Sequence, residues 1–357
     1  MKISVISAAD LDARTLAAWR GMQQANPALA SPYFCPEFSQ AVAAVRPALR
    51  IAVLESNQVI AGLFPFENSG GRGQPAGAPL SDHHGIVCAP GTRFDWSALL
   101  RATGLSYWTF DHLPREQAPP DAAVTHCLSP TLDLSRGFAP WKQGRSDASG
   151  SMAKLDRAAR KLTREVGPLR LETHGSDRAV FDAVLQGKSM QCRRTGTHDF
   201  FAERWARELV ERIWQTEGET FGGRLSALYA GDRLVAAHMG MRSATTWHWW
   251  FPYYDRAFAT YSPGALLLLR VAQAAAEQGH TVLDLGKGDE PYKQNFADSG
   301  LPLVEGWVKR PALATALQGA RRRARRWWRE SGLLQPARRD LFPWLRRAGA
   351  VATRMPI

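Results

Sequence analysis

Apolar positions recur along the chain in two rhythms, and together these predict a protein of mixed α/β class. Short runs rich in β-branched and apolar residues predict strands at 49–54, 59–65, 106–110, 169–173, 225–230, 233–242, 246–251 and 281–285, with a further short strand within 1–10. Helical spacing predicts helices at 16–22, 36–45, 96–103, 151–166, 177–195, 200–216 and 263–278. Polar, Gly-rich stretches at 68–79 and 141–150 predict loops.

Two predicted strand pairs that lie far apart in the chain have a similar sequence pattern. In each pair a strand leads through a tight turn, Ser56-Asn57 or Gly231-Asp232, into a second strand that begins with a small-residue step. This similarity favours a duplicated α/β unit, and a length of 357 residues also suggests two lobes at about 150 residues per domain. We therefore expect an N-terminal lobe at 1–140, a second lobe at 141–308 and an extension at 309–357.

Composition narrows the class of protein and its compartment. Hydrophobic residues make up 45% of the chain, which excludes disorder for most of its length. The chain has no apolar run of ~18 residues and no basic start followed by an apolar stretch, so we expect neither a membrane span nor a signal peptide. The four cysteines are scattered without a C-x-x-C pair, which argues against a zinc site or a disulfide framework. We expect a cytoplasmic protein.

The net charge of +12 is concentrated at the C-terminus. Residues 309–357 carry 13 basic and 2 acidic residues, which leaves about +1 for the first 308. Arginines there alternate with Trp327, Trp328 and Trp344, a combination that suits a helix lying on anionic lipid head groups. A solvated or partner-docking extension is the main alternative, and nucleic acid is not the expected partner. The extension therefore suggests a protein peripheral to the inner face of the cell membrane.

The helix at 263–278 begins with residues that suit an anion-binding site. Ser262 is a good N-cap and Pro263 a good first helical residue, while Gly264 and Ala265 keep bulky side chains away from the free amides of the first turn. Those amides and the positive end of the helix dipole favour a pyrophosphate group. A well-capped helix without a ligand is the alternative. Together with Tyr261, these residues are our candidates for cofactor binding.

A polar segment follows the strand at 281–285. Asp284 stands in an otherwise apolar strand, where an unpaired carboxylate is costly, so it needs a partner such as Lys287, Lys293 or an arginine. Gly286 and Gly288 allow the backbone to approach a ligand closely. The pattern predicts a functional corner after this strand.

The segment from Val282 to Phe296 resembles the D-x-G-x-G-D-E-x-Y-K-x-x-F block of the bacterial CelD/BcsL-like acetyltransferases, relatives of the FemAB peptidoglycan aminoacyltransferases. The similarity extends to residues 261–268, 188–196 and 79–85. It implies tandem GNAT-like (acyl-CoA N-acyltransferase) lobes, with mixed sheets flanked by helices, before the basic extension. It also implies acyl-CoA, most simply acetyl-CoA, as co-substrate. From the scattered cysteines and the adjacent histidines we expect no metal. The usual Q/R-x-x-G-x-G/A pyrophosphate signature is degraded, with Ala259, Ser262 and Gly264 at its three positions.

The resemblance also implies roles for individual residues. Tyr292, in the first turn of a short helix, is placed to protonate a departing thiolate, and Lys293 accompanies it. His238 could act as the base, although a lone strand histidine is more often a core residue. Adjacent His83 and His84 point in different directions and are expected to be structural rather than metal ligands. The candidates for substrate binding are Asp82, Lys188, Arg193, Arg194, Asp255, Asp284, Asp289 and Glu290; Asp289 and Glu290 alternatively only cap the helix.

These observations predict a GNAT-type, acyl-CoA-dependent acyltransferase (EC 2.3.1). Its acceptor would be an amine or hydroxyl of a sugar or of an envelope or exopolysaccharide precursor. FemAB-like aminoacyl transfer is one alternative, but tRNA needs a basic groove that the nearly neutral body does not suggest. A non-catalytic membrane-surface module of a polysaccharide biosynthesis complex is another, which the degraded signature keeps open.

Overall fold

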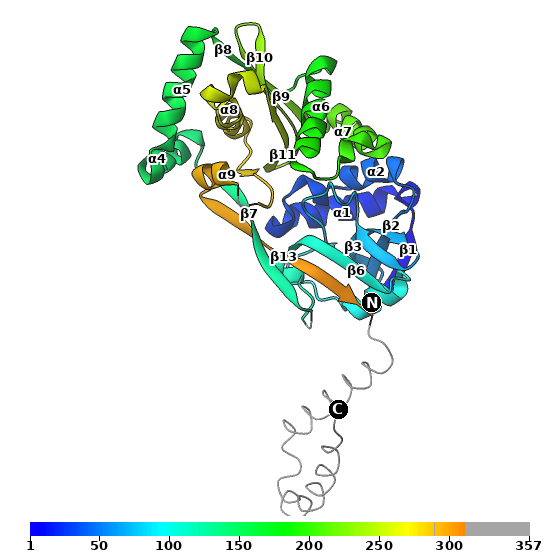
Figure 1. Ribbon diagram of the computed structural model, residues 1–357. Helices are drawn as coiled ribbons and strands as arrows, with labels where there is room; N and C mark the ends of the chain where they lie inside the picture. The colour runs from blue at the N-terminus through cyan, green and yellow to red at the C-terminus, as the bar shows by residue number, and fades with distance from the viewer. Residues whose placement is uncertain (121, 289, 311–357) are drawn as a thin grey trace, which may run out of the picture. The chain divides into compact units, whose positions relative to one another are not determined.

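The strands join into one mixed sheet in the order β1-β2-β3-β4-β6-β13-β7-β12-β11-β10-β9-β8, with β5 paired to β3 (Figure 1). The computed structural model describes residues 1–120, 122–288 and 290–310. The strands are β1 Lys2–Ile6, β2 Leu49–Ser56, β3 Val59–Ser69, β4 Arg72–Pro75, β5 Val87–Cys88, β6 Tyr107–Pro114, β7 Val124–Asp133, β8 Leu169–Glu172, β9 Phe221–Ala230, β10 Arg233–Ser243, β11 Thr246–Tyr254, β12 Val282–Asp284 and β13 Ser299–Lys309. The helices are α1 Ala13–Ala25, α2 Pro36–Val45, α3 Trp96–Ala102, α4 Phe138–Ser149, α5 Ser151–Glu165, α6 Arg178–Thr195, α7 Arg204–Gln215, α8 Pro263–Glu277 and α9 Pro291–Phe296.

Most predicted helices and strands are present, with ends shifted by a few residues. The segment 141–150, predicted as a loop, belongs instead largely to α4. Trp141 is buried there and its ring stacks on Phe296, with centroids 6.1 Å apart, so a long-range aromatic contact supports a helix that the local polarity disfavours. The predicted loop at 68–79 contains β4, and β7 and β13 had not been predicted.

Strands β7 and β13 connect the first half of the sheet, β1–β6, with the second half, β8–β12, because each of them pairs with a strand of the other half. β7 follows the first half in sequence but pairs with β12 of the second half, through Val282↔Asp133 and Asp284↔Thr131. β13 follows the second half but pairs with β6 of the first half and with β7. This exchange of strands makes the sheet continuous from β1 to β8, and residues 1–309 form one compact unit.

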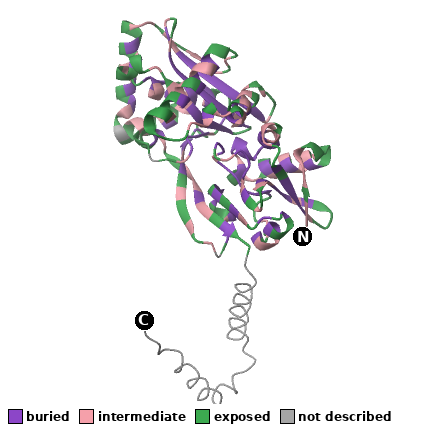
Figure 2. Ribbon diagram, turned by 45° about the vertical axis from the view of Figure 1, so that its right-hand side comes forward, coloured by how far each residue is buried: buried purple, intermediate pink, exposed green. Residues whose placement is uncertain are grey.

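Two helical layers cover opposite faces of the second half of the sheet. On one face α8 contributes Leu267 to a hydrophobic cluster that also contains Trp249 of β11. On the other face α6 contributes Phe181 to a cluster that contains Met239 of β10 and residues of α2 and α7. Figure 1 shows α8 and the α6–α7 pair on either side of β9–β11, and Figure 2 shows buried residues following the strands between them. We call these two sides the α8 face and the α6 face.

Strands β11 and β12 run side by side for a short distance and then separate. They pair in parallel at Thr246↔Val282, Trp247↔Leu283 and His248↔Asp284. β12 ends at Asp284, whereas β11 continues to Tyr254. The chain turns away at Gly286, whose φ of 71° lies in the left-handed region that favours glycine. The pair His248 and Asp284 therefore marks the point where the sheet opens.

The described helices include none that is long and apolar enough to cross a membrane. The basic extension, apart from Lys309 and Arg310, lies outside the described residues.

Candidate active site

Asp284, at the end of β12, is the buried centre of a hydrogen-bond network. Its Oδ2 lies 2.7 Å from His83 Nε2, while its Oδ1 accepts hydrogen bonds from the Ser129 hydroxyl at 2.5 Å and the Gly286 amide at 3.0 Å. The side chain is fully buried, so these partners replace the water that a carboxylate requires. A partner was correctly expected, but the proposed lysine or arginine was wrong: imidazoles and a hydroxyl from distant segments fill this role.

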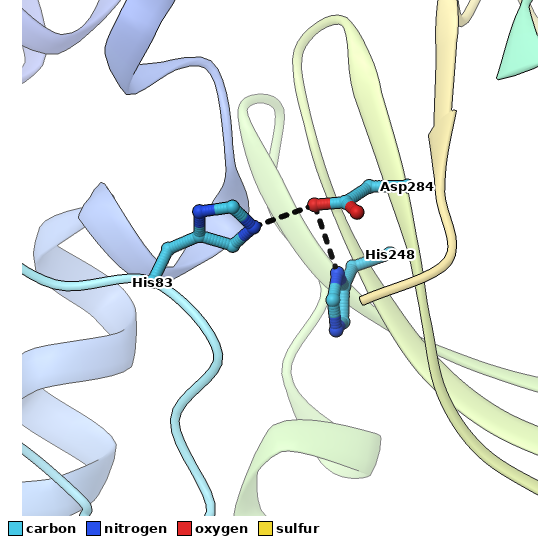
Figure 3. A group of neighbouring side chains, drawn as sticks. All are labelled: His83, His248 and Asp284. Atoms are coloured by element: carbon cyan, nitrogen blue, oxygen red, sulfur yellow. Dashed lines mark hydrogen bonds and ion pairs between the residues drawn. The ribbon is translucent and has the colours of Figure 1, made fainter. Parts of the chain in front are cut away.

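His248, opposite Asp284 on β11, lies between two carboxylates. Its Nδ1 is 3.3 Å from Asp284 Oδ2, and its Nε2 is 2.9 Å from Asp82 Oδ2. Figure 3 shows His248 and His83 both directed at the same carboxylate oxygen of Asp284. Burial alone would lower the pKa of His248, but Asp284 and Asp82 outweigh it and raise the pKa to about 9. At neutral pH the ring is therefore an imidazolium held by both carboxylates.

Asp82 connects this network to the surface. Its side chain is 28% exposed, whereas those of His248 and Asp284 are fully buried. Burial would raise the pKa of Asp82, but the hydrogen bond from His248 and the nearby imidazoles lower it overall. A Cβ built on Gly286 would lie 2.9 Å from Asp82 Oδ2, so only glycine lets this loop approach the carboxylate so closely. Asp82 is an ionised carboxylate beside the point where β11 and β12 separate.

The loop after β12 is fixed by two lysines. Lys293 is buried, and its ammonium donates to the carbonyls of Gly286 at 3.1 Å and Lys287 at 3.0 Å and pairs with Glu290 at 2.9 Å. Lys287 donates to the backbone carbonyl of Asp111 at 3.0 Å. Lys293 therefore holds the loop in shape, and its polar contacts lie within the protein rather than at an open site.

The α8 face carries the other two candidate catalytic residues. His238 is fully buried, stacks on Trp249 with ring centroids 4.0 Å apart, and accepts the Trp250 amide at its Nε2. Burial lowers the pKa of His238 well below its ordinary value, so the ring is a buried core histidine rather than the base that the sequence offered as one possibility. Tyr292 packs against the hydrophobic cluster that contains Trp249, and burial raises its pKa, which keeps the phenol protonated at neutral pH. Trp249 is the first β11 residue beyond the last pair with β12, so Tyr292 lies at the opening.

The start of α8 offers few donors to an anion. Ser262 adopts a left-handed conformation (φ 52°) and its side chain makes no capping hydrogen bond. Pro263 has no amide hydrogen, and the amides of Ala265 and Leu266 already donate to the Ser262 carbonyl. The Gly264 amide remains for a ligand. Pyrophosphate can approach, because a Cβ at Gly264 would meet only Tyr254 at 3.5 Å, but the cradle is sparse.

Tyr261, the fifth candidate for cofactor binding, faces helix α5. Its hydroxyl donates to Glu165 at 2.8 Å, and the ammonium of Lys161 lies 5.3 Å from its ring centroid. Tyr261 therefore fastens the turn before α8 to the basic helix α5.

The remaining candidates for substrate binding have separate surroundings. Lys188 on α6 lies near α9: burial lowers its pKa, and the charge of Glu290 opposes this effect. Arg193 and Arg194 are exposed in the last turn of α6, where cations suit the helix dipole. Asp255 caps a 3-10 helix by accepting the Ala257 amide at 2.9 Å. Asp289 lies outside the described residues.

His83, His248 and Asp284 are side chains of the types that bind metal ions, and their possible ligand atoms lie within 4.8 Å of one another. These atoms, however, already interact within the network: His83 with Asp284, and His248 with Asp284 and Asp82. Protonated His248 supplies one positive charge against the two carboxylates, Asp82 and Asp284. Each of the three groups thus has a hydrogen-bond or ion-pair partner within the network.

Comparison with known proteins identifies the architecture. A model of the acetyltransferase (GNAT) domain family matches residues 149–294, which span β8–β12 and the start of α9. The chain has the GNAT fold. The predicted α/β class, with a mixed sheet flanked by helices on the GNAT fold, is confirmed, and the strands of the two predicted lobes join into one continuous sheet. No curated protein matches the chain in sequence.

Three solved structures share this GNAT fold at low identity. FemX is 10% identical with a TM-score of 0.54, covering 89% of this chain and 99% of its own. The C-terminal domain of a putative lysylphosphatidylglycerol synthetase from Agrobacterium fabrum is 12% identical with a TM-score of 0.52, covering 85% and 94%. A conserved protein of unknown function from Bacteroides thetaiotaomicron is 12% identical with a TM-score of 0.52, covering 83% and 98%. At these identities the likeness concerns the fold alone.

Sequence reasoning missed His248 and Ser129. His248 lies in a strand of aromatic residues, Trp247 to Phe251, and reads as one more buried ring. A histidine among three tryptophans was the available signal, because an imidazole in such a strand needs a polar partner.

Proposed function

We propose that the protein is an acyltransferase that moves an acyl group from acyl-CoA to an amine or hydroxyl of a sugar or envelope polysaccharide precursor. The observation that carries this proposal is the chain Asp82–His248–Asp284 at the point where β11 and β12 separate. The resemblance of residues 282–296 to the CelD/BcsL-like block supports the choice of acceptor class. Acetyl-CoA is the simplest donor.

Asp82 would receive the acceptor. Its partly exposed carboxylate can accept a hydrogen bond from an amine or hydroxyl, while the His248 imidazolium fixes its orientation. A carboxylate with a lowered pKa is a weak base. The ammonium that forms when an amine attacks a thioester is strongly acidic, however, so Asp82 can take that proton as the new bond forms.

Tyr292 would serve the leaving group on the α8 face. The thioester supplies an acyl carbon and a thiolate leaving group, and a protonated phenol can give its proton to that thiolate. The raised pKa of Tyr292 keeps this proton available. His238, neutral and stacked on Trp249, would shape the wall of the site rather than act as a base.

An amine-acceptor assay tests the proposal. Purified protein would be given acetyl-CoA with glucosamine, galactosamine or hydroxylamine, and thiol release would be followed. We expect turnover with at least one amine and a large loss in Asp82→Asn and Tyr292→Phe. Isothermal titration with CoA thioesters supplies the decisive negative result: absence of binding for every chain length tried would overturn acyl-CoA as donor.

The sparse start of α8 favours one second candidate, aminoacyl transfer with an aminoacyl ester as donor. Among residues 262–266, which the structure describes, the Gly264 amide is the one left for a pyrophosphate. The nearly neutral charge of residues 1–308 weighs against a tRNA-borne donor. Parallel assays with radiolabelled acetyl-CoA and with a charged tRNA mixture would separate the two donors by which label reaches an acceptor.

We also propose that the basic extension brings the enzyme to an anionic membrane surface. The support is its sequence, in which arginines alternate with tryptophans. Such a position would suit an acceptor that is an envelope precursor.

A further inference from the structure

We propose that His112 is a proton relay that carries the acceptor proton from Asp82 to Asp111 at the surface. His112 Nε2 lies 3.9 Å from Asp82 Oδ1, on the opposite carboxylate oxygen from the one that His248 holds. His112 Nδ1 lies 3.0 Å from Asp111 Oδ1. The His112 side chain is 8% exposed and that of Asp111 is 57% exposed. The three groups thus lead from the network to water.

The backbone around His112 is held at several points. His84 Nε2 accepts the amides of both Asp111 and His112 at 3.1 Å, and Lys287 donates to the Asp111 carbonyl at 3.0 Å. Burial lowers the pKa of His84 to about 3, so its ring stays neutral and its Nε2 serves as the acceptor of these two amides. The loop that carries Lys287 also contacts Asp82 through Gly286. The loop after β12 therefore lies against Asp82 and also holds the backbone at Asp111, so one loop positions both ends of the relay.

The groups around His112 determine which of them can give it a proton and which can accept one. Its titratable neighbours are Asp82 and Asp111 within ion-pair distance and the rings of His83 and His84, with centroids at 6.2 Å and 6.0 Å. Both His83 and His84 are already engaged, with Asp284 and with backbone amides. The two carboxylates are the remaining proton donor and acceptor.

This relay rests on the proposed function, in which Asp82 receives the acceptor proton. An acceptor bound at Asp82 covers its exposed side, so the proton needs another exit. The new carbon–nitrogen bond forms, the carbon–sulfur bond breaks, and the amine proton moves to Asp82. Asp82 then gives that proton to His112 Nε2, the imidazolium releases its Nδ1 proton to Asp111, and Asp111 passes it to water. After the product leaves, Nδ1 takes up a proton from water through Asp111 and Nε2 releases its proton to water through Asp82, which restores the starting tautomer. Tyr292, which protonated the thiolate, regains its own proton from water.

The first test needs no substrate. In protein labelled with ¹⁵N-histidine, ring nitrogen resonances of His112, assigned with His112→Gln, are compared in Asp82→Asn, Asp111→Asn and the control Asp232→Asn, an exposed carboxylate in the β9–β10 turn. We expect both variants at Asp82 and Asp111 to shift the His112 ring resonances and Asp232→Asn to leave them in place. Unchanged resonances in the variant at Asp82 or at Asp111 would disconnect His112 from that carboxylate and overturn the relay, whether or not the protein proves to be an acyltransferase.

The second test is kinetic. With the best amine of the assay above, we expect His112→Gln to lower kcat at least tenfold with KM little changed, and added imidazole to restore much of the loss. A matched variant, His174→Gln, removes a histidine from a distant surface and should keep wild-type kcat. A kcat loss in His112→Gln that no concentration of imidazole or related buffer restores would assign His112 a structural role. If the wild-type enzyme turns over none of the amines, the proposed function is contradicted. The resonance test then decides whether His112 is coupled to the two carboxylates.

Discussion

His238 and His248 lie on neighbouring strands and are both fully buried, but they occupy opposite faces of the sheet. On the α8 face His238 stacks on Trp249, and burial lowers its pKa far below the ordinary value. On the α6 face burial acts in the same direction on His248, but Asp284 and Asp82 raise its pKa to about 9. Equal burial thus gives a neutral ring on one face and a cationic ring on the other.

The difference assigns different chemistry to the two faces. The α6 face concentrates charge at the opening of the sheet, and its carboxylate Asp82 is partly exposed, which suits a polar acceptor. On the α8 face the buried His238 is neutral and Tyr292 is kept protonated by burial, which suits a thioester and its leaving group. The partners of a buried group, rather than its burial, decide its charge here.

The largest expected effect comes from removing the centre of the α6 face. Asp284→Ala leaves His248 and His83 without their shared carboxylate, so we expect a loss of about 3–5 kcal/mol in the free energy of unfolding. Urea denaturation followed by circular dichroism measures it. The control Ser129→Ala removes one hydrogen bond and should cost about 1 kcal/mol. A loss for Asp284→Ala no larger than that of the control would show that the network contributes little.

Neutralising the partly exposed end of the same network should affect rate more than stability. For Asp82→Asn we expect kcat to fall by about 10²–10³, in the range of a lost general base, with a smaller change in KM. Asp232→Asn, an exposed carboxylate in the β9–β10 turn, is the matched control and should retain wild-type kcat. Steady-state thiol release measures both. Equal activity of the two variants would remove Asp82 from the proposed mechanism.

The pH dependence of stability should separate the two histidines. The folded-state pKa of His248 lies above the ordinary 6.5, so its contribution is complete below pH 6.5 and is lost as pH rises through about 9. We expect the wild type to lose up to about 3 kcal/mol between pH 6.5 and 9.5, and His248→Gln to lose clearly less. Denaturation midpoints at several pH values provide the measurement. His238→Gln should keep the wild-type slope, and a flattened slope in that variant would contradict the assignment of the cation to the α6 face.

Removing the basic extension should change the activity of either face least. A chain ending at Lys309 retains the compact unit, so its kcat/KM with soluble amines should stay within about twofold of the full chain. Sedimentation with vesicles containing phosphatidylglycerol should fall sharply in the shortened chain, and neutral vesicles serve as the control. Unchanged binding to the anionic vesicles would refute the proposed membrane role of the extension.

The sequence by itself determined the elements and several local requirements. Strand and helix periodicities are local, so α2, α8, β2, β3, β9 and β10 could be predicted within a few residues. Asp284 in an apolar strand required a partner, and the glycine at 286 indicated a close approach. The resemblance of residues 282–296 then indicated the GNAT fold, which the family match at residues 149–294 supports.

Only the tertiary structure decided which groups meet. Asp284 meets Ser129 because β7 crosses into the second half of the sheet, and it meets His83 from 201 residues away. His248 becomes a cation because two carboxylates from distant segments converge on one ring. Such partnerships leave no periodic trace in the sequence, since they depend on the exchange of β7 and β13 and on the separation of β11 from β12. The charge of a buried group is set by neighbours that the chain brings together only when it folds.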